Sequence, residues 1–478
     1  MKITRVTIFI FSILTILAVL SFVFPTEGLQ VGSLHLKYAN LNTFLENDTD
    51  SDAEVDRNLA NMNRELDVST LGSMYDTLQY YKHFVQSSPL RIHLPDNNPA
   101  FFDPVFQKFE EARSKKKLSR VLHYGDSQIE MDRISNILRQ QLQQTFGGAG
   151  VGMIPAIQTV ATYSLSQSYS GDLTRYIMFG DSTTRRAAHR RYGPMAQFSA
   201  LNGQATLSFR NSGSRHAEPF SQQYQRISLL VDRTGGWKAN ISADTIVRID
   251  TVQQEQVALV SWTLKNKIGR ARVSLNGRAD IYGILLDGSH GITVDNFPLR
   301  GSSGTLFTGI DQKLMQQTFT VLNPSLIILQ FGGNAIPSIS SMTRIDKYML
   351  DIERQFAALK KAAPKARFLF IGPSDMSKRY NGVMKTRKFL PELNNALKQT
   401  ALKNGIAYWD MFQVMGGENS MAKWVKHSPP LAGSDHIHFT AAGAKEIGTL
   451  LSKSLLTNYQ FYKVRQQVGN DLINQLLE

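Results

Sequence analysis

The sequence predicts an α/β fold that is interrupted by an all-β module and preceded by an apolar N-terminal helix. Short apolar runs alternate with amphipathic helical stretches around residues 103–152 and again after residue 300, which predicts a parallel sheet flanked by helices. Between these parts, residues 153–290 show short alternating runs and no long helical period, a pattern typical of a β-sandwich. The simplest arrangement is one α/β domain with an inserted β-sandwich.

The composition is that of a globular protein, with 42% hydrophobic and 19% charged residues in a chain of 478. Lys and Arg number 53 and Asp and Glu 39, so the net charge is +14, which suits a polyanion such as nucleic acid, anionic lipid or an acidic cell-wall polymer. The lack of cysteine excludes disulfides, thiol nucleophiles and cysteine-based metal sites. Because no recognised nucleic-acid-binding module is present, we expect no nucleic-acid partner.

The N-terminus predicts export from the cytoplasm. Lys2 and Arg5 precede an uncharged run over residues 6–25, which is long enough to span a bilayer, and no small-x-small cleavage site follows closely. We therefore expect residues 1–27 to form a signal-anchor in preference to a cleaved signal peptide, with the rest of the chain outside. This predicts a periplasmic or otherwise extracytoplasmic protein that is anchored to the inner membrane.

The elements before the insertion follow in order. Residues 28–95 include a polar, acidic stretch, and Leu66–Val85 shows some helical periodicity, so this part predicts a linker or tether or a small packing segment. The first α/β part, residues 96–152, is expected to contain a helix, a buried strand and a second helix: Asp103–Lys116, Arg120–Tyr124 and Glu130–Phe146.

The elements of the insertion and of the second α/β part continue the series. The insertion, residues 153–290, contains six alternating runs separated by turn residues such as Asn276-Gly277: Ala205–Phe209, Ile227–Asp232, Thr245–Asp250, Val257–Trp262, Arg270–Leu275 and Ile281–Leu286. The second α/β part, residues 291–457, alternates strands with helices: Leu322–Phe331, Ser341–Ala363, Arg367–Ile371, Lys385–Asn404, Ile406–Asp410 and Thr440–Leu456. Residues 458–478 predict a separate C-terminal helix.

The tripeptide Gly125-Asp126-Ser127 stands directly after a predicted strand and before a helix. A Ser at the carboxyl end of a strand lies where open α/β sheets bind ligands, and a helix N-terminus favours developing negative charge. The blunter interpretation is that Asp126 or Ser127 only caps the helix. The tripeptide alone is therefore a weak signal.

Two further pieces fit a hydrolytic site. Asn334 follows a strand directly, where its amide can donate a hydrogen bond to an oxyanion or can simply form a turn. Asp435 and His438 stand three residues apart before the last predicted helix of the α/β domain, so Asp435 can fix the tautomer of His438 and His438 can act as general base for Ser127. His436 is a rival base, but it is only one residue from Asp435.

Together the three pieces resemble the SGNH (GDSL) hydrolase superfamily, with GDS at 125–127, GxN at 332–334 and DxxH at 435–438 in that order. The resemblance covers roughly residues 118–152 and 292–457. No G-x-S-x-G elbow occurs, which argues against an ordinary α/β-hydrolase. The resemblance implies an SGNH-type parallel sheet and a reaction that needs neither a metal nor another cofactor.

The resemblance also implies the role of each residue. Ser127 is the nucleophile, His438 the base and Asp435 the residue that orients the base. The oxyanion hole is formed by the backbone N–H of Ser127, the Asn334 side chain and the N–H of an isolated glycine. We place that glycine at Gly301, in preference to the alternatives Gly150 and Gly152. A second GDS that ends at Ser182 is interpreted as a turn, because no apolar helix follows it.

The β insertion narrows the resemblance to bacterial peptidoglycan O-acetylesterases, whose hydrolase domain carries an inserted carbohydrate-module-like domain. This implies a serine esterase that removes O-acetyl groups from a cell-envelope glycan, above all peptidoglycan, through an acetyl-enzyme intermediate. The alternatives are an O-acetyltransferase with the same triad and a noncatalytic glycan-binding scaffold. Trp237 and Trp262 of the insertion are candidates to stack on a sugar ring, although a buried core position is the commoner role.

Overall fold

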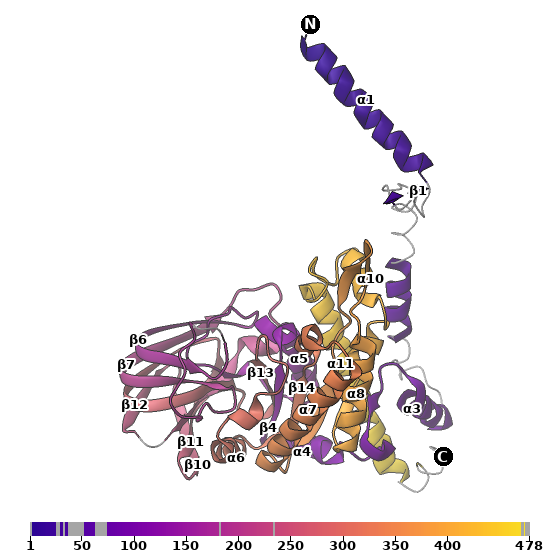
Figure 1. Ribbon diagram of the computed structural model, residues 1–478. Helices are drawn as coiled ribbons and strands as arrows, with labels where there is room; N and C mark the ends of the chain where they lie inside the picture. Colours follow the sequence, from indigo (N-terminus) through magenta and orange to yellow (C-terminus); the bar gives the residue numbers. More distant parts are fainter. Residues whose placement is uncertain are drawn as a thin grey trace.

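The structure is a computed structural model that describes residues 2–24, 29–31, 34–36, 52–62, 74–180, 183–232, 235–469 and 473. Figure 1 shows an α/β body beside an antiparallel β body, with the N-terminal helix α1 standing apart from both. The α/β body is assembled from the two parts of the chain that precede and follow the β body.

A six-stranded sheet forms the centre of the α/β body, in the order β13-β4-β14-β15-β18-β3. Its strands are β3 (Ile92–His93), β4 (Leu118–Gly125), β13 (Gly291–Pro298), β14 (Pro324–Gln330), β15 (Arg367–Ile371) and β18 (Ala407–Trp409). All pairs are parallel except that of β3 with β18 at one edge. The register sets Gly125 opposite both Pro298 and Gln330, so the residues that follow these strands emerge together.

Helices cover both faces of this sheet because its strands are apolar on both sides. In β4, Val121 belongs to the core on one face and Leu122 to the core on the other. The Val121 side is covered by α4 (Asp103–Ser114), α5 (Ser135–Phe146) and α11 (Ala441–Val468), and the Leu122 side by α6 (Gln312–Leu322), α7 (Met342–Ala362) and α8 (Leu390–Lys403). Shorter elements complete the body: α9 (Met411–Val414), α10 (Ser420–Lys426), β16 (Ser377–Tyr380) and β17 (Val383–Thr386). The predicted α/β fold is confirmed.

The β body is an eight-stranded antiparallel sheet, in the order β10-β11-β8-β12-β7-β6 with β5 and β9 also paired to β12. Its strands are β5 (Gly152–Ile154), β6 (Leu165–Ile177), β7 (Gln197–Asn211), β8 (Tyr224–Asp232), β9 (Trp237–Ser242), β10 (Ile246–Gln254), β11 (Val257–Ile268) and β12 (Arg270–Asp287). These strands have an apolar core of their own, in which Leu207, Leu229 and Val273 are fully buried.

Strand β12 makes this sheet continuous, where the sequence predicts a sandwich of separate sheets. Its first part pairs with β7 and β9 and its last part with β8 and β5, with a register shift between Ile281 and Gly283. The expected turn at Asn276-Gly277 lies inside this strand. Gly277 has a φ of +119°, and a Cβ there would meet the carbonyl oxygen of Gly236 at 2.1 Å, so the glycine serves close strand pairing instead.

Part of the predicted tether is packed against the α/β body. Strand β1 (Leu29–Val31) pairs with β2 (Leu34–Leu36), a helix covers residues 52–62, and α3 (Met74–Ser87) follows. In α3, Tyr81 stacks on Phe461 of α11 with ring centroids 5.0 Å apart. For α3 and β3 the structure therefore favours the packing-segment alternative over a free tether, whereas residues 37–51 and 63–73 lie outside the described residues.

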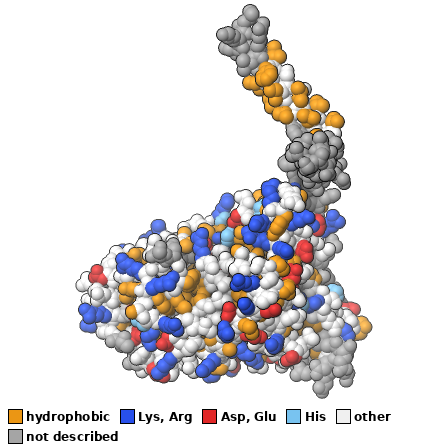
Figure 2. All heavy atoms as spheres, in the orientation of Figure 1, with side chains coloured by type: hydrophobic (Ala, Val, Ile, Leu, Met, Phe, Trp, Pro, Cys, Tyr) orange, Lys and Arg blue, Asp and Glu red, His pale blue; other side chains and the backbone are white. Residues whose placement is uncertain are grey.

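Helix α1 (Lys2–Val23) coincides with the apolar N-terminal run. Its side chains from Thr7 to Leu20 are exposed, and Figure 2 shows them as a mainly hydrophobic rod. Across the described ranges, none of the helices combines the length and the apolarity that crossing a membrane requires. The anchor predicted over residues 6–25 is therefore not supported by the structure.

The predicted separate helix over residues 458–478 is instead the continuation of α11. Asn458 lies at the expected boundary, but it is buried and its side chain donates a hydrogen bond to the carbonyl oxygen of Ser454 at 2.8 Å. The helix therefore runs without a break to Val468. Residues 470–472 and 474–478 lie outside the described residues.

Candidate active site

Ser127 lies at the carboxyl end of β4, at the start of the short 3₁₀ helix η3 (Ser127–Asp132). Asp126 caps η3, because its side chain accepts a hydrogen bond from the N–H of Gln128 at 2.9 Å. The capping interpretation of the tripeptide is thus satisfied by Asp126 alone. It leaves the half-buried hydroxyl of Ser127 available for chemistry.

The turn after Ser127 is longer than the sequence suggests. Met131 and Asp132 have φ angles of +62° and +67°, a left-handed backbone that no regular helix can contain. Helix α5 therefore begins at Ser135, five residues later than the predicted start at Glu130.

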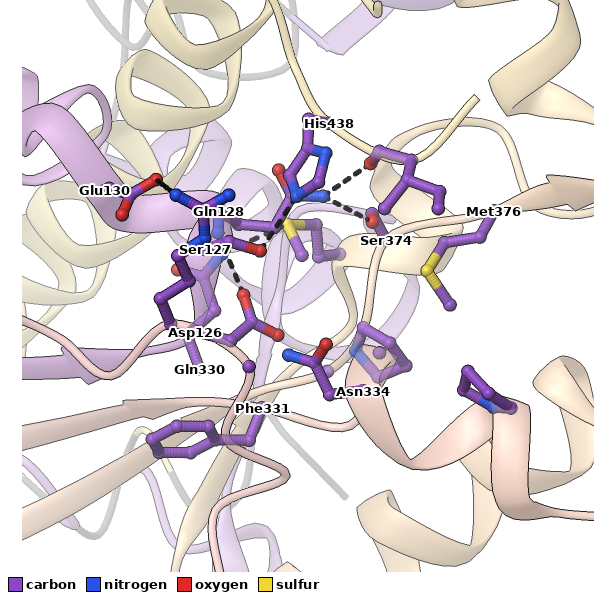
Figure 3. Close-up of a pocket in the computed structure, with 18 of the residues that line it drawn as sticks. Asp126, Ser127, Gln128, Glu130, Gln330, Phe331, Asn334, Ser374, Met376 and His438 are labelled. Carbon is purple, nitrogen blue, oxygen red and sulfur yellow. Dashed lines mark hydrogen bonds and ion pairs between the residues drawn. The ribbon is translucent and has the colours of Figure 1, made fainter. Parts of the chain in front are cut away.

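Ser127, His438 and Asp435 form one chain of hydrogen bonds, and Figure 3 shows Ser127 and His438 side by side. Oγ of Ser127 lies 2.8 Å from Nε2 of His438, and Nδ1 of His438 lies 2.7 Å from Oδ2 of Asp435. Oδ1 of Asp435 also accepts the N–H groups of Ile437 and His438, both at 3.0 Å. Burial alone would raise the pKa of Asp435, but these hydrogen bonds outweigh it and hold the pKa below its ordinary value. Asp435 is thus an ionised partner that fixes the ring of His438.

His436 does not take part in this chain of hydrogen bonds. Its backbone has a φ of +56°, and its carbonyl oxygen accepts a hydrogen bond from the N–H of Ser377 at 3.1 Å. Its ring Nδ1 is buried and has no hydrogen-bond partner among the described residues. Burial and Arg379 lower the pKa of His436, against the opposite effect of Asp435. The structure therefore brings His438, and not His436, to Ser127.

The two predicted oxyanion donors lie at the same cleft as Ser127. Gly301 is exposed, with a φ of +78° and no atom within 4 Å of where its Cβ would be. Asn334 is also exposed, and its Nδ2 donates one hydrogen bond to the carbonyl oxygen of Ser302 at 3.1 Å, which fixes the amide and leaves its second N–H. The alternatives Gly150 and Gly152 are both buried. A Cβ at Gly150 would meet the carbonyl oxygen of Leu286 in β12, and a Cβ at Gly152 would meet the carboxylate of Asp295 in β13.

The cleft has a volume of about 500 Å³ and is lined by residues from every carboxyl strand end near Ser127. Figure 3 shows its polar floor around Ser127, Asn334 and His438. Three arginines that sequence reasoning did not single out also line it: Arg133, Arg300 and Arg387. No sequence motif marks them, because they become neighbours only through the fold.

Gln128 was also missed, and it connects the nucleophile turn to the histidine loop. Its Nε2 donates to the carbonyl oxygen of Ile437 at 2.6 Å and to Oγ of Ser374 at 3.1 Å. Its Oε1 accepts the N–H of Phe439 at 3.3 Å. Gln128 thus holds the residues on both sides of His438 and positions the base. The only sequence signal for it is its place directly after Ser127.

The buried carboxyl of Asp126 has unusual electrostatics. Burial raises the pKa of Asp126 to about 6, although the hydrogen bond from the Gln128 N–H and the nearby His438 lower it. The folded protein therefore binds this proton more tightly than the unfolded chain, whose pKa is near 3.8. Stability is consequently lost as the pH rises from about 4 to about 6, and the penalty is complete above that range.

Asp126→Asn is expected to remove this penalty. Asn also caps helices, so the cap should be kept. The variant should gain unfolding free energy relative to the wild type, and this gain should be larger at pH 8 than at pH 4 by on the order of 2–3 kcal/mol. Urea unfolding of both proteins between pH 4 and pH 8 measures it. Asp311→Asn, at the cap of α6, is the matched control for changing a capping carboxylate. If the difference in unfolding free energy between the wild type and Asp126→Asn does not change with pH, the raised pKa of Asp126 is contradicted.

The two candidate sugar-binding residues do not line this cleft. Trp262 is only 7% exposed in the core of the β body, so it has no free ring face for a sugar and that candidate role is wrong. Trp237 begins β9, is half-buried and packs against the same core. Ser182 lies outside the described residues. In the part of the chain that the structure describes, no group of three or more His, Asp or Glu side chains is arranged to hold a metal ion.

Comparisons with known proteins place these residues in a family context. Residues 269–446 match the model of the GDSL-like Lipase/Acylhydrolase family, a stretch that includes Gly301, Asn334, Asp435 and His438 but starts after Ser127. A search of curated proteins gave no match. Among solved structures, a peptidoglycan O-acetylesterase is similar with a TM-score of 0.56 and 18% identity over 76% of this chain and 96% of that chain. A family two carbohydrate esterase from Cellvibrio japonicus gives a TM-score of 0.21 and 13% identity over 66% of this chain and 100% of that chain.

Residues 269–446 therefore match the GDSL-like lipase/acylhydrolase family model, and the resemblance predicted from the motifs is confirmed. The family match and the fold likeness together support a carboxylic ester hydrolase. The likeness to the first solved structure shows the fold over 76% of this chain.

Proposed function

We propose that this protein is a serine esterase that removes O-acetyl groups from a cell-envelope glycan, with peptidoglycan as its substrate. The observation that carries the proposal is the chain of hydrogen bonds from Ser127 through His438 to Asp435 at the rim of an open cleft. The fold likeness to a peptidoglycan O-acetylesterase supports the substrate class.

The first half of the reaction transfers the acetyl group to the enzyme. Oγ of Ser127 attacks the acetyl carbonyl carbon while Nε2 of His438 accepts the hydroxyl proton. The carbonyl electrons move onto oxygen, and that oxyanion accepts hydrogen bonds from the N–H groups of Ser127 and Gly301 and from Asn334. When the intermediate collapses, the carbon–oxygen bond to the sugar breaks and His438 gives its proton to the departing sugar hydroxyl.

The second half releases acetate. His438 takes a proton from a water molecule, whose oxygen attacks the acetyl carbon of the acyl-enzyme, and the same donors stabilise the second oxyanion. The bond to Oγ then breaks, and Ser127 regains its proton from His438. Asp435 stays ionised throughout and stabilises the imidazolium that forms in each half.

The charge of the cleft suits an acidic polymer. Arg133 and Arg387 line it and form no ion pair with a described Asp or Glu, and Nε of Arg387 is buried without a hydrogen-bond partner in the described chain. Peptidoglycan carries carboxylates on its peptides, so these cations favour its approach. The net charge of +14 acts in the same direction over longer distances.

We also propose that the protein works outside the cytoplasm. The basic residues before the apolar N-terminal run are the sequence feature behind this proposal. Fractionation of cells that produce the full chain should recover it outside the cytoplasm, and recovery in the cytoplasmic fraction would overturn the location.

Acetate release from O-acetylated peptidoglycan, with no added acceptor, tests the proposed function. The wild type should release acetate and Ser127→Ala should not. If acetate appears only when a glycan acceptor is supplied and is found on that acceptor, the protein is an acetyltransferase. If neither reaction occurs although p-nitrophenyl acetate is hydrolysed, the glycan assignment is wrong.

Asn334→Ala is expected to lower kcat by on the order of 10²–10³ with little change in KM. The reason is that its amide N–H meets a charge that exists only in the transition state. Steady-state kinetics on p-nitrophenyl acetate measure the change, with Asn381→Ala in the exposed β16–β17 turn as a control that should leave both constants unchanged. An increase in KM alone would make Asn334 a substrate contact.

A further inference from the structure

A second hollow of about 380 Å³ lies where the β body meets the α/β body. Its walls come from β6, β7 and the segment 151–165 on one side and from η3 and the end of β13 on the other. Glu130 and Arg300 line both this hollow and the catalytic cleft. The two are therefore adjacent, and a polymer bound at Ser127 can extend from one into the other.

The hollow contains one cation whose charge is not balanced. Arg175 of β6 is half-buried, and its Nε donates to Oε1 of Gln197 at 2.6 Å, but no described Asp or Glu forms an ion pair with it. The other two arginines in the wall are balanced, because Arg139 lies 2.7 Å from Asp132 and Arg300 lies 3.7 Å from Glu130. Burial lowers the pKa of Arg175 below its ordinary value, as expected for a cation that has lost water without gaining an anion.

The segment that follows the hollow's lining residue Thr184 is also basic. It contains the exposed residues Arg185, Arg186 and Arg190. None of these three arginines forms an ion pair with a carboxylate of the described chain, and Arg186 instead donates to the carbonyl oxygen of Gly180 at 3.3 Å. Their charge adds to that of Arg175 at longer range, so an anionic ligand is favoured.

We propose that this hollow binds a carboxylate of the glycan substrate, with Arg175 as its principal donor, so that the β body selects acidic glycans for the esterase. The inference rests on the proposed function, since it concerns the part of the substrate next to the acetylated sugar. Arg175 can present its terminal N–H groups to a carboxylate because only its Nε is engaged with Gln197. The apolar wall residues Ile154, Ile177 and Met195 exclude water around that ion pair.

Two sources of carboxylate fit this chemistry: the peptide attached to a muramic acid and a uronic acid within the chain. The first requires an O-acetylated muropeptide and the second an O-acetylated uronate oligosaccharide. Both are compared with copies whose carboxylates have been amidated, which keeps size and acetylation but removes the charge. A preference for one acidic ligand over the other identifies the source.

Binding is measured by calorimetry in a Ser127→Ala background, so that no ligand is consumed. Arg175→Gln in this background should weaken the acidic ligand by about ten- to a hundredfold and leave the amidated ligand unaffected, because a hydrogen bond to a charged group is lost. Arg272→Gln is the matched control. Arg272 is exposed on β12 and pairs with Ser208 of β7. Ser208 is eleven residues from Gln197 along β7, roughly 35 Å at about 3.3 Å per residue, so Arg272 lies far from Arg175 and its partner Gln197.

The outcomes separate this inference from the proposed function. Weaker binding of the amidated ligand than of the acidic ligand supports the inference only if Arg175→Gln abolishes the difference, because Arg133 and Arg387 of the catalytic cleft also attract carboxylates. Equal binding of acidic and amidated ligands, or equal effects of Arg175→Gln and Arg272→Gln, overturns it even if acetate is released normally. If the wild type releases no acetate from any glycan while acidic ligands still bind through Arg175, the proposed function fails and the anion site stands.

Discussion

Ser127→Ala is expected to lower kcat by on the order of 10⁴–10⁶ for any acetyl ester. The hydroxyl is the only group in hydrogen-bond contact with Nε2 of His438 among the described residues, so its loss removes covalent catalysis altogether. The oxyanion donors remain, and they should leave a residual rate above that of water alone. Steady-state kinetics with p-nitrophenyl acetate measure the loss.

Ser182→Ala provides the comparison, because Ser182 ends the other GDS tripeptide of the chain. It should change kcat by less than about twofold, since no apolar helix follows this tripeptide in the sequence and we assign it no catalytic role. A fluorophosphonate probe followed by peptide mapping gives an independent readout. Modification of Ser127 is the expected result, whereas modification of Ser182 with Ser127 untouched would move the nucleophile to the other tripeptide.

His438→Ala is expected to be nearly as damaging as Ser127→Ala, because the nucleophile and its base act as one unit. Without the imidazole, no group at 2.8 Å remains to accept the proton of Oγ. The losses should not add, so the double variant should resemble either single variant. Kinetics of the three proteins on the same ester test both expectations.

His436→Ala is the matched control, since His436 is two residues away on the same loop. Its ring is not hydrogen bonded to Ser127, so most activity should be retained. A greater loss for His436→Ala than for His438→Ala would make His436 the base and would show that the loop rearranges when substrate binds.

The convergence of the candidate catalytic residues could be predicted because parallel strands place their carboxyl ends together. Ser127 and Asn334 each follow an apolar strand closely, so the sequence alone indicates that they converge at one edge of the sheet. Asp435 and His438 could be paired because three residues of spacing in a turn allow a hydrogen bond. The local rules of strands and turns were sufficient for these residues.

Other features depend on contacts between distant segments, and the sequence could not reveal them. Gln128 forms a hydrogen bond to a residue about three hundred positions away. The proposed role of Arg175 depends on a hollow that exists only where the β body meets the α/β body. The turn at Gly277 was mistaken because a glycine that permits close strand pairing has the same local signature as a turn. The helical periodicity around α3 allowed a packing segment to be predicted, but nothing in the sequence indicates that α11 is its partner.

The pairing of Leu286 with Gly152 has a consequence for how the chain folds. Strand β4 is central in its sheet, but both of its neighbours, β13 and β14, are synthesised after the whole β body. When β4 pairs with β13, the chain between Gly125 and Gly291 is closed into a loop. Loop closure costs entropy if the intervening chain is disordered. Once β5 and β12 have paired, the two ends of the intervening chain are already neighbours, so little further chain entropy is lost when β4 joins β13. We therefore expect the antiparallel sheet to form before β4 pairs with β13, so that Ser127 acquires its surroundings late.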